Sequence, residues 1–350
     1  MVDTGLIRVS GHGGGKHYAL LDAGKSKLNP DKYPRCQIAD NNTLLRAPVR
    51  AVSNGDTAVM LTLAGYITHT QDRPELPAHT NPPACSEDWF ALYQGGGAAS
   101  PINCYYSSVE IKRHFRDRND KGLRYSRACG VLFTPEHLLR VYHSRDVALE
   151  LRETGEKKLG SLMPRLFSGY LPERRSSLLV FGNSFEAAEK ILAGEFDSER
   201  IRMAGISKKT FLSPRNLGKP LFYCPIMKEA LPLLGLMRYP GWSDSICDYA
   251  AKQVYFSFKR RSDVFYAAGE DGSLLFIGIE LDLTRLAGLI RVLRSRQNIT
   301  VALLCLDWQK QFYSDIFERF AGDGGGNVRI LSMNNDAVLN MGVQLGEYWG

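Results

Sequence analysis

The first twenty residues combine two β-prone runs with a glycine-rich centre. Leu6–Val9 opens on branched apolar residues, and Lys16–Leu21 returns with an aromatic and apolar run. Between them His12–Gly15 is almost entirely glycine, which adopts positive φ angles at no steric cost. This pattern predicts an antiparallel β-hairpin over residues 5–21, with its turn at His12–Gly15.

The clearest pattern lies between residues 260 and 307. Two β-prone runs, Ser262–Ala268 and Ser273–Leu281, flank a glycine-bounded turn and predict a hairpin. The next segment, Thr284–Arg296, is predicted to be a helix because its apolar residues fall on one face, at Leu286, Leu289, Ile290 and Leu293. Thr300–Leu306 is an uncharged apolar run, which predicts a buried strand. A helix between two such strands implies at least one parallel pair.

Weaker patterns extend this alternation over most of the chain, so the predicted fold class is α/β with a mixed sheet. Residues 43–65 are predicted to form a helix that is broken at Pro48 and at Asn54-Gly55. After the strand Ser177–Gly182 we expect a helix that runs from Asn183, as its N-cap, to Gly194. The other predicted elements are helices over 109–115, 156–167 and 309–320, and strands over 124–133, 138–150, 211–225, 252–258 and 327–331.

Prolines and glycines divide the chain into units. The stretch Thr70–Pro101 contains five prolines and the run Gly95–Gly97, which is typical of a long irregular connection. We therefore expect a hairpin unit over 1–28, a helical and irregular connection over 29–100, and an α/β domain over 101–350.

Charge is distributed unevenly. The chain of 350 residues has a formal net charge of +7, which is compatible with nucleic-acid binding but is not diagnostic. Residues 110–127 are strongly basic, and their expected DNA contacts are Lys112, Arg113, Arg116, Arg124 and Arg127. The neighbouring aromatic residues Tyr105, Tyr106, Phe115 and Tyr125 could stack on unpaired bases. The alternative is a solvated helix face whose aromatic neighbours lie in the core.

Cysteine usage and hydropathy indicate a compartment. The seven cysteines form no C-x-x-C pair, which favours free thiols in a reducing environment over disulfides or a zinc site. No apolar stretch resembles a signal peptide or reaches the length of a membrane span. We therefore expect a cytoplasmic protein without a membrane partner.

Three acidic residues surround the predicted 260–281 hairpin. Asp263 opens its first strand, and Glu280 and Asp282 end its second. Residues two apart in a strand share a face, so Glu280 and Asp282 should point the same way. This order resembles the core of PD-(D/E)xK nucleases, with Ser262-Asp263 and Glu280-Leu281-Asp282 matching the motif. The resemblance implies that Asp263 and Glu280 would hold Mg²⁺.

The motif departs from the nuclease pattern at its last position. Asp282 stands where the lysine is expected, so no cation is positioned to balance charge on the attacked phosphate. Lys259, Arg260 or Arg285 could take that role, or Asp282 could cap the following helix. We expect a degenerate nuclease-like core around residues 255–331, with no cofactor unless it is an active Mg²⁺-dependent nuclease.

Residues 5–24 resemble the wing of a winged-helix DNA-binding domain. The resemblance implies phosphate contacts from Arg8, His12, Lys16 and His17. The three helices that precede a wing are absent from the sequence, so we expect either a start codon upstream or a truncated gene copy. A wing without its recognition helix keeps phosphate contacts and loses most base readout.

Taken with the acid-bearing hairpin, the wing resembles the replication–relaxation family of plasmids and integrative conjugative elements. The middle of the chain is also similar to accessory proteins of Gram-positive conjugative elements. The residues that carry this likeness are Tyr106-Ser107-Ser108, Ile111-Lys112, Ser126-Arg127, Gly130-Val131-Leu132, Val141-Tyr142, Ala148-Leu149, Phe181-Gly182-Asn183, Leu306-Asp307 and Gln309. The resemblance implies a DNA-associated accessory role, with a relaxase or replication proteins of the element as partners.

Three functions remain open from the sequence. The first is a non-catalytic DNA-binding accessory protein of a mobile genetic element. The second is a Mg²⁺-dependent endonuclease or nickase of the PD-(D/E)xK type. The third is a protein-interaction module without DNA binding. The missing lysine favours the accessory protein over the endonuclease. The missing recognition helix leaves the protein-interaction module open as an alternative.

Overall fold

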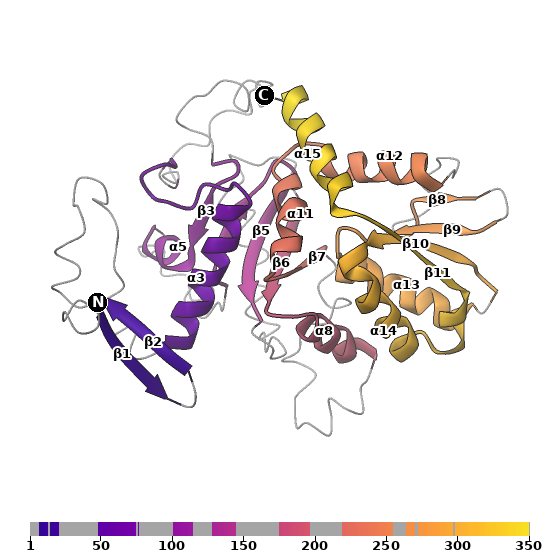
Figure 1. Cartoon of the computed structure of the whole chain (residues 1–350), viewed down its shortest axis with the longest axis horizontal. Coiled ribbons are helices and arrows are strands. Elements are labelled where there is room, and N and C mark those ends of the chain that lie inside the picture. Colours follow the sequence, from indigo (N-terminus) through magenta and orange to yellow (C-terminus); the bar gives the residue numbers. More distant parts are fainter. Residues whose placement is uncertain are drawn as a thin grey trace.

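The computed structural model shows a mixed α/β protein (Figure 1). It describes residues 7–12, 15–20, 48–74, 76, 101–114, 128–144, 175–196, 219–254, 264–269, 272–296 and 298–349. The predicted helix 156–167 lies outside these residues. The fold class predicted from the sequence is confirmed.

One sheet has five strands in the order β3-β4-β5-β6-β7. Its first three strands are antiparallel neighbours, and β5, β6 and β7 run parallel. The strands are β3 (Tyr105–Ser107), β4 (Gly130–Phe133), β5 (His137–His143), β6 (Arg175–Gly182) and β7 (Leu221–Pro225). A short helix, α5 (Ser108–His114), follows β3 directly.

The second sheet has four strands in the order β11-β10-β9-β8, and in its described residues it confirms the order of elements predicted for residues 260–307. An antiparallel hairpin, β8–β9, is followed by helix α13 and by β10, which pairs parallel to β9. Helix α14 then leads to β11, parallel to β10. The elements are β8 (Ala267–Ala268), β9 (Leu274–Ile277), α13 (Leu283–Ser295), β10 (Val301–Leu306), α14 (Lys310–Phe320) and β11 (Val328–Met333).

The two sheets lie side by side and share their hydrophobic layers (Figure 1). They meet where Phe222 of β7 forms a bridge with Asp282, and the Tyr223 N–H donates to the Leu281 carbonyl over 3.0 Å. Leu178 and Leu179 of β6 belong to opposite layers, as side chains alternate along a strand. One layer contains α3 (Pro48–Leu63), α11 (Leu231–Leu236), α12 (Trp242–Val254) and α15 (Asn335–Trp349), and the other contains α8 (Glu186–Phe196), α13 and α14.

The prediction of a broken helix over residues 43–65 was wrong, because α3 is continuous. It begins at Pro48, where a missing N–H costs nothing, and continues through Asn54-Gly55 to Leu63. Leu61 is fully buried in the core, and the nearby Tyr66 hydroxyl donates to the Leu234 carbonyl over 3.0 Å. Tertiary packing therefore outweighs the local cost of glycine, roughly 1 kcal/mol. Residues 48–74, which the sequence analysis placed in a connection, pack in the same core as the sheets.

Two other local predictions were wrong. Asn183 is not the N-cap of α8, because the helix begins at Glu186, whose N–H donates to the Ser184 hydroxyl over 3.3 Å, and it continues past Gly194. Residues 252–254 belong to helix α12 rather than to a strand. Trp242 and Ile246 of that helix are buried, so its apolar face decides its conformation. Helix α15 was not predicted at all.

The N-terminal hairpin is present, as the sequence predicts. Strand β1 (Ile7–His12) pairs antiparallel with β2 (Gly15–Leu20), and the register ends with His12 opposite Gly15. The structure describes the backbone of this hairpin. Its likeness to a winged-helix wing stays a prediction.

Candidate functional site

The acidic residues Glu280 and Asp282 lie in a turn that follows β9, not in the strand itself. The strand ends at Ile277, and Leu281 has a φ angle of 49°, in the left-handed region. Helix α14 anchors this turn, because the Tyr313 hydroxyl donates a hydrogen bond to the Gly278 carbonyl over 2.5 Å. The prediction that both acids occupy strand positions was therefore wrong, because the strand is shorter than its β-prone sequence.

The Glu280 carboxylate is buried among polar partners. Arg285 of α13 donates to it over 3.0 Å, the Ser243 hydroxyl of α12 also donates, and the Tyr266 hydroxyl lies 3.4 Å away. The Arg285 guanidinium also stacks over the Tyr266 ring, 3.9 Å from its centre. The side chains of Glu280 and Arg285 are 5% and 17% exposed. This is a largely desolvated ion pair that joins the turn after β9 to α13, and Ser243 adds a contact from α12.

Asp282 has a structural role that the sequence had offered as one of its alternatives. Its carboxylate accepts the backbone N–H groups of Thr284 at 2.9 Å and Arg285 at 3.4 Å, which makes it the N-cap of α13. It also accepts the Leu221 N–H at 3.3 Å and so connects the two sheets. Burial raises the pKa of Asp282 to about 6, although the nearby Arg285 opposes that shift.

The remaining parts of the predicted metal centre are not brought together in the described residues. Asp263, Lys259 and Arg260 lie outside them. Among the residues that the structure does describe, no group of three His, Cys, Asp or Glu side chains could hold a metal ion. Of the three cations suggested for the missing lysine, Arg285 lies against Glu280, as an ion-pair partner.

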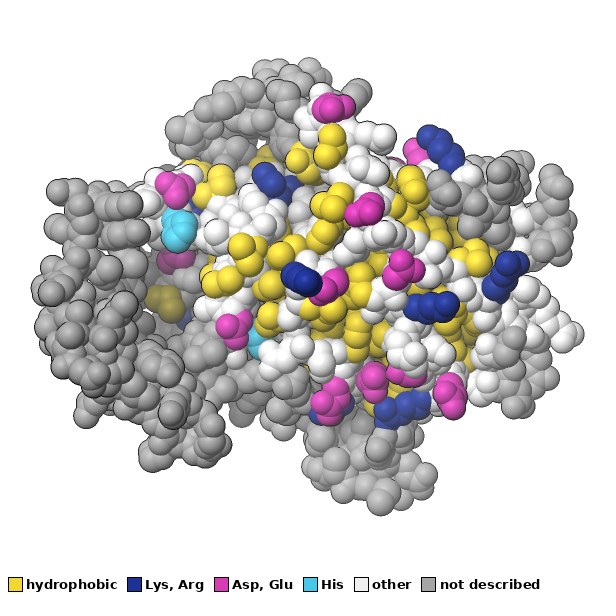
Figure 2. All heavy atoms as spheres, viewed as in Figure 1, with side chains coloured by type: hydrophobic (Ala, Val, Ile, Leu, Met, Phe, Trp, Pro, Cys, Tyr) yellow, Lys and Arg dark blue, Asp and Glu magenta, His cyan; other side chains and the backbone are white. Residues whose placement is uncertain are grey.

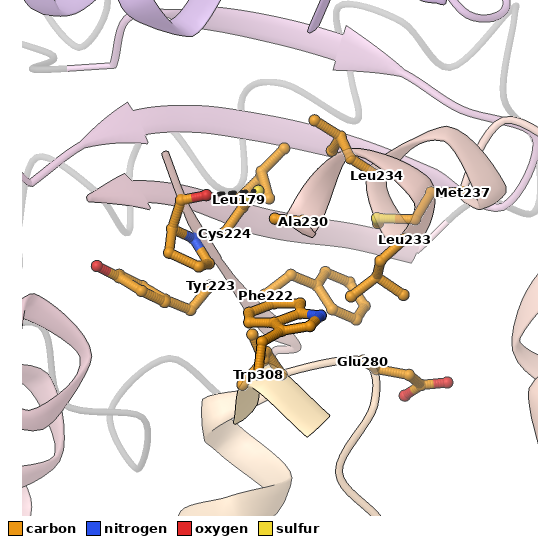
Figure 3. Close-up of a pocket in the computed structure, with 12 residues that line it drawn as sticks. Leu179, Phe222, Tyr223, Cys224, Ala230, Leu233, Leu234, Met237, Glu280 and Trp308 are labelled. Carbon is orange, nitrogen blue, oxygen red and sulfur yellow. Dashed lines mark hydrogen bonds between the residues drawn. The ribbon is translucent and has the colours of Figure 1, made fainter. Parts of the chain in front are cut away.

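Figure 3 shows the seam between the sheets next to this acid cluster. Phe222, Trp308 and Met237 surround a cavity of about 10 Å³, and the Glu280 carboxylate points away from these apolar side chains. Such a volume holds about one water molecule. At this cavity the described side chains fill the seam and leave space for no more than about a water molecule.

Loops that follow four parallel strands meet above this seam. Phe185, after β6, stacks on Trp308, after β10, with ring centres 5.9 Å apart. The Trp308 indole donates to Asn335, after β11, and Asn335 donates to the Glu229 carbonyl, after β7. Ligands of open α/β sheets commonly bind at this end. Here the loops bond to each other, which supports a packing role.

The structure describes only some of the residues that were predicted to bind DNA. Arg8, His12, Lys16 and His17 lie on the hairpin, where the register sets Arg8 opposite Ala19 and Lys16 opposite Gly11. On the face seen in Figure 2, acidic and basic side chains are interspersed over the described residues. Of the basic stretch, Lys112 and Arg113 lie on α5, whereas Arg116, Arg124 and Arg127 fall outside the described residues.

The helix that carries Lys112 is anchored by a capping box. The Ser107 N–H donates to the Glu110 carboxylate over 2.8 Å, and the Glu110 N–H points back to the Ser107 hydroxyl. Glu110 also pairs with Arg73, whose buried guanidinium lies 4.3 Å from the centre of the Tyr106 ring. Tyr106, one of the aromatic residues named for base stacking, is thus a core residue, as the alternative prediction held.

A larger pocket adjoins this helix, and sequence reasoning missed it. We call it the α3 pocket: about 410 Å³, with walls from α3, the segment after it, β3 and α5. Its lining includes Asn54, Val59, Leu63, Tyr105 and Glu110. The sequence analysis selected Tyr105 as a possible base-stacking residue because it lies near the basic stretch. Nothing in the sequence showed that α3 would pack beside it.

Two simpler predictions concerned the cysteines and membrane spans. All the described cysteines are buried free thiols, namely Cys104, Cys129, Cys224, Cys247 and Cys305. Burial raises the pKa of Cys224 and of Cys247 to about 12, so neither is a ready nucleophile. None of the described helices combines the length and the apolar character that crossing a bilayer requires.

Comparisons with protein-family models, with curated proteins and with solved structures found no match to this chain. The resemblance to the replication–relaxation family therefore stays a prediction.

Proposed function

We propose that the protein is a DNA-binding accessory protein of a mobile genetic element and that it does not cleave DNA. The glycine-tipped hairpin carries this proposal, since its paired strands hold Arg8 and Lys16 within a short ribbon. Lys112 on α5 adds a third basic residue, and the chain has an excess of positive charge. Such residues bind phosphates without reading sequence.

The surroundings of the acidic residues support a non-catalytic role. Glu280 is engaged by Arg285 and Ser243, and Asp282 is engaged by backbone N–H groups. A nuclease centre needs carboxylates that are open to a metal and to the attacking water. Here both carboxylates hold α13 and the sheet junction in place, which favours a structural function for them.

Binding is tested by fluorescence anisotropy with a labelled DNA duplex at low salt. We expect weak, sequence-independent binding by the full chain. The triple variant Arg8→Ala, Lys16→Ala, Lys112→Ala should bind about tenfold more weakly. Lys252→Ala, an exposed lysine on α12, is the control that removes a charge elsewhere. Equal binding by the triple variant and the parent chain would refute this assignment of the DNA contacts. No binding at all would favour the protein-interaction module.

A further inference from the structure

The second sheet has a long strand, β11, at its outer edge. Strand β11 pairs with β10 along all six of its residues, and no strand or bridge among the described residues pairs with its other side. The register to β10 advances residue by residue, so no bulge interrupts the strand. It contains no proline and no lysine, and Arg329 is its only charged residue. The strand therefore has little of the protection by which proteins usually keep an exposed edge from pairing.

The other outer strands of the two sheets are shorter or bridged. Strand β8 has two residues and β3 has three. Beside β3, the Tyr105 N–H donates to the Ile67 carbonyl over 2.9 Å. The outer side of β7 is bridged from Phe222 to Asp282. The exposed edge of β11 differs from these, and such an edge is a template for pairing with another strand.

The side chains of β11 are those of an interior strand. Val328 and Ile330 pack against the layer that contains α13 and α14, and Leu331 and Met333 pack against the opposite layer. All four side chains are half-buried. Apolar residues on both faces are typical of parallel strands that are covered on both sides. A neighbouring strand that extends both layers must therefore itself be apolar on both faces.

We propose that a second copy of the chain occupies this edge, through antiparallel pairing of β11 with β11 about a two-fold axis. The two four-stranded sheets would then form one continuous sheet of eight strands. The copy supplies a preformed strand of the same length with apolar residues on both faces, whereas an unstructured peptide would first lose conformational entropy. This inference does not depend on DNA binding.

The symmetry of the pairing restricts its register. A two-fold axis perpendicular to the sheet keeps equal faces together, so the axis passes through a residue of β11. A register centred on Ile330 or on Leu331 places apolar side chains at the axis. Either register also keeps the two Arg329 side chains from lying directly opposite each other, where like charges are destabilising.

Sedimentation velocity of the full chain over a range of concentrations tests the proposal. Pairing of six residues buries a small area, so we expect a reversible dimer with a Kd of about 10 µM. Ser332→Lys, at an exposed position of β11, should raise this Kd at least about tenfold, because an edge lysine opposes strand pairing. Thr70→Lys adds the same charge at an exposed turn position after α3 and should leave the Kd unchanged.

The exposed apolar residues of α15 provide a competing surface. Leu339 and Val343 are 51% and 60% exposed. Val343→Lys should leave the Kd unchanged if β11 forms the interface. Loss of the dimer in Val343→Lys but not in Ser332→Lys would overturn the proposal, and so would a parent chain that stays monomeric up to about 200 µM.

Crosslinking tests the edge without adding a charge. Residues that face each other at the axis have Cα atoms about 5 Å apart, within the reach of a disulfide. Mild oxidation of Ile330→Cys or of Leu331→Cys should therefore yield a covalent dimer in at least one of the two variants, and the parent chain is the control. No dimer beyond that of the parent chain in either variant would overturn the proposal.

Discussion

Glu280 and Arg285 show how a residue pattern that resembles a catalytic motif can serve packing instead. Their side chains form an ion pair that is nearly removed from water and that ties the turn after β9 to α13. In such a pair the attraction roughly offsets the cost of desolvation, but the loss of one partner leaves a buried charge without compensation. The consequence of breaking the pair is therefore large and measurable.

Glu280→Ala should lower the free energy of unfolding by about 3 kcal/mol, because Arg285 would remain buried without its carboxylate. Urea denaturation of the parent chain and the variant measures the difference. Glu186→Ala is the control, since the Glu186–Lys190 pair is exposed on α8 and should contribute less than about 1 kcal/mol. Identical unfolding midpoints for Glu280→Ala and the parent chain would contradict the role of this pair.

The raised pKa of Asp282 implies that the stability of the protein depends on pH. Its pKa in the folded chain is raised to about 6, above the value of about 3.9 for an exposed aspartate, so the folded state binds the proton more tightly. The contribution of Asp282 to stability is therefore greatest below about pH 4 and falls as the pH rises to about 6, by at most about 3 kcal/mol.

Unfolding of Asp282→Asn, measured between pH 4 and 7, should lack this decline, because asparagine can still cap α13 but does not ionise in this range. Asp244→Asn, at an exposed position of α12, should retain the profile of the parent chain. A decline of the same size in Asp282→Asn and the parent chain would show that another group is responsible.

At the scale of elements, the sequence predicted best where one pattern dominates. The β8–β9 hairpin, α13 and β10 agree with their alternating, helical and apolar patterns. It failed where distant contacts decide the outcome. Helix α3 passes through Asn54-Gly55 because its apolar face packs on β5 and α11, which no local window contains.

The same distinction holds for the candidate site. The identities of Glu280 and Asp282 could be selected from the sequence, and the capping role of Asp282 was one of the alternatives. Two of their partners, Ser243 and Leu221, could not be predicted, because they are distant in sequence and reach the turn only through the packing of α12 and β7. The α3 pocket escaped prediction for the same reason, since its walls come from three separate segments.

Helix α3 itself yields a prediction about glycine. Gly55 lies inside the helix, and a Cβ atom added there would meet nothing within 4 Å. Gly55→Ala should raise the free energy of unfolding by about 0.5–1 kcal/mol, because alanine loses less backbone entropy in a helix. Thermal unfolding measures the gain. Gly65→Ala is the opposing control: Gly65 has a φ angle of 87° and lies against the Arg238 side chain, so this change should destabilise the protein. Destabilisation by Gly55→Ala would contradict the continuous helix.

At the scale of the whole molecule, two bridged sheets share their hydrophobic layers, and the seam between them is closed by side chains. The carboxyl ends of the parallel strands, where α/β proteins often bind ligands, are occupied by mutual contacts of Phe185, Trp308 and Asn335. The DNA contacts proposed above lie elsewhere, on the N-terminal hairpin and on α5.

The proposed lack of nuclease activity is tested with the whole chain. Incubation of supercoiled plasmid with the full chain and Mg²⁺ or Mn²⁺ should produce no nicking above a buffer control. Glu280→Gln should behave like the parent chain, because a carboxylate held by Arg285 does not act on DNA. Robust nicking that is abolished by Glu280→Gln and by Asp263→Ala would establish the endonuclease function in place of the accessory role.

The salt dependence of DNA binding tests the central claim most directly. If the hairpin and α5 together neutralise about four phosphates, the logarithm of the association constant for duplex DNA should fall against the logarithm of salt concentration with a slope of about −3.6. The triple variant Arg8→Ala, Lys16→Ala, Lys112→Ala should have a slope of about −0.9, since about one contact would remain. A slope near zero for the parent chain would contradict phosphate-based DNA binding.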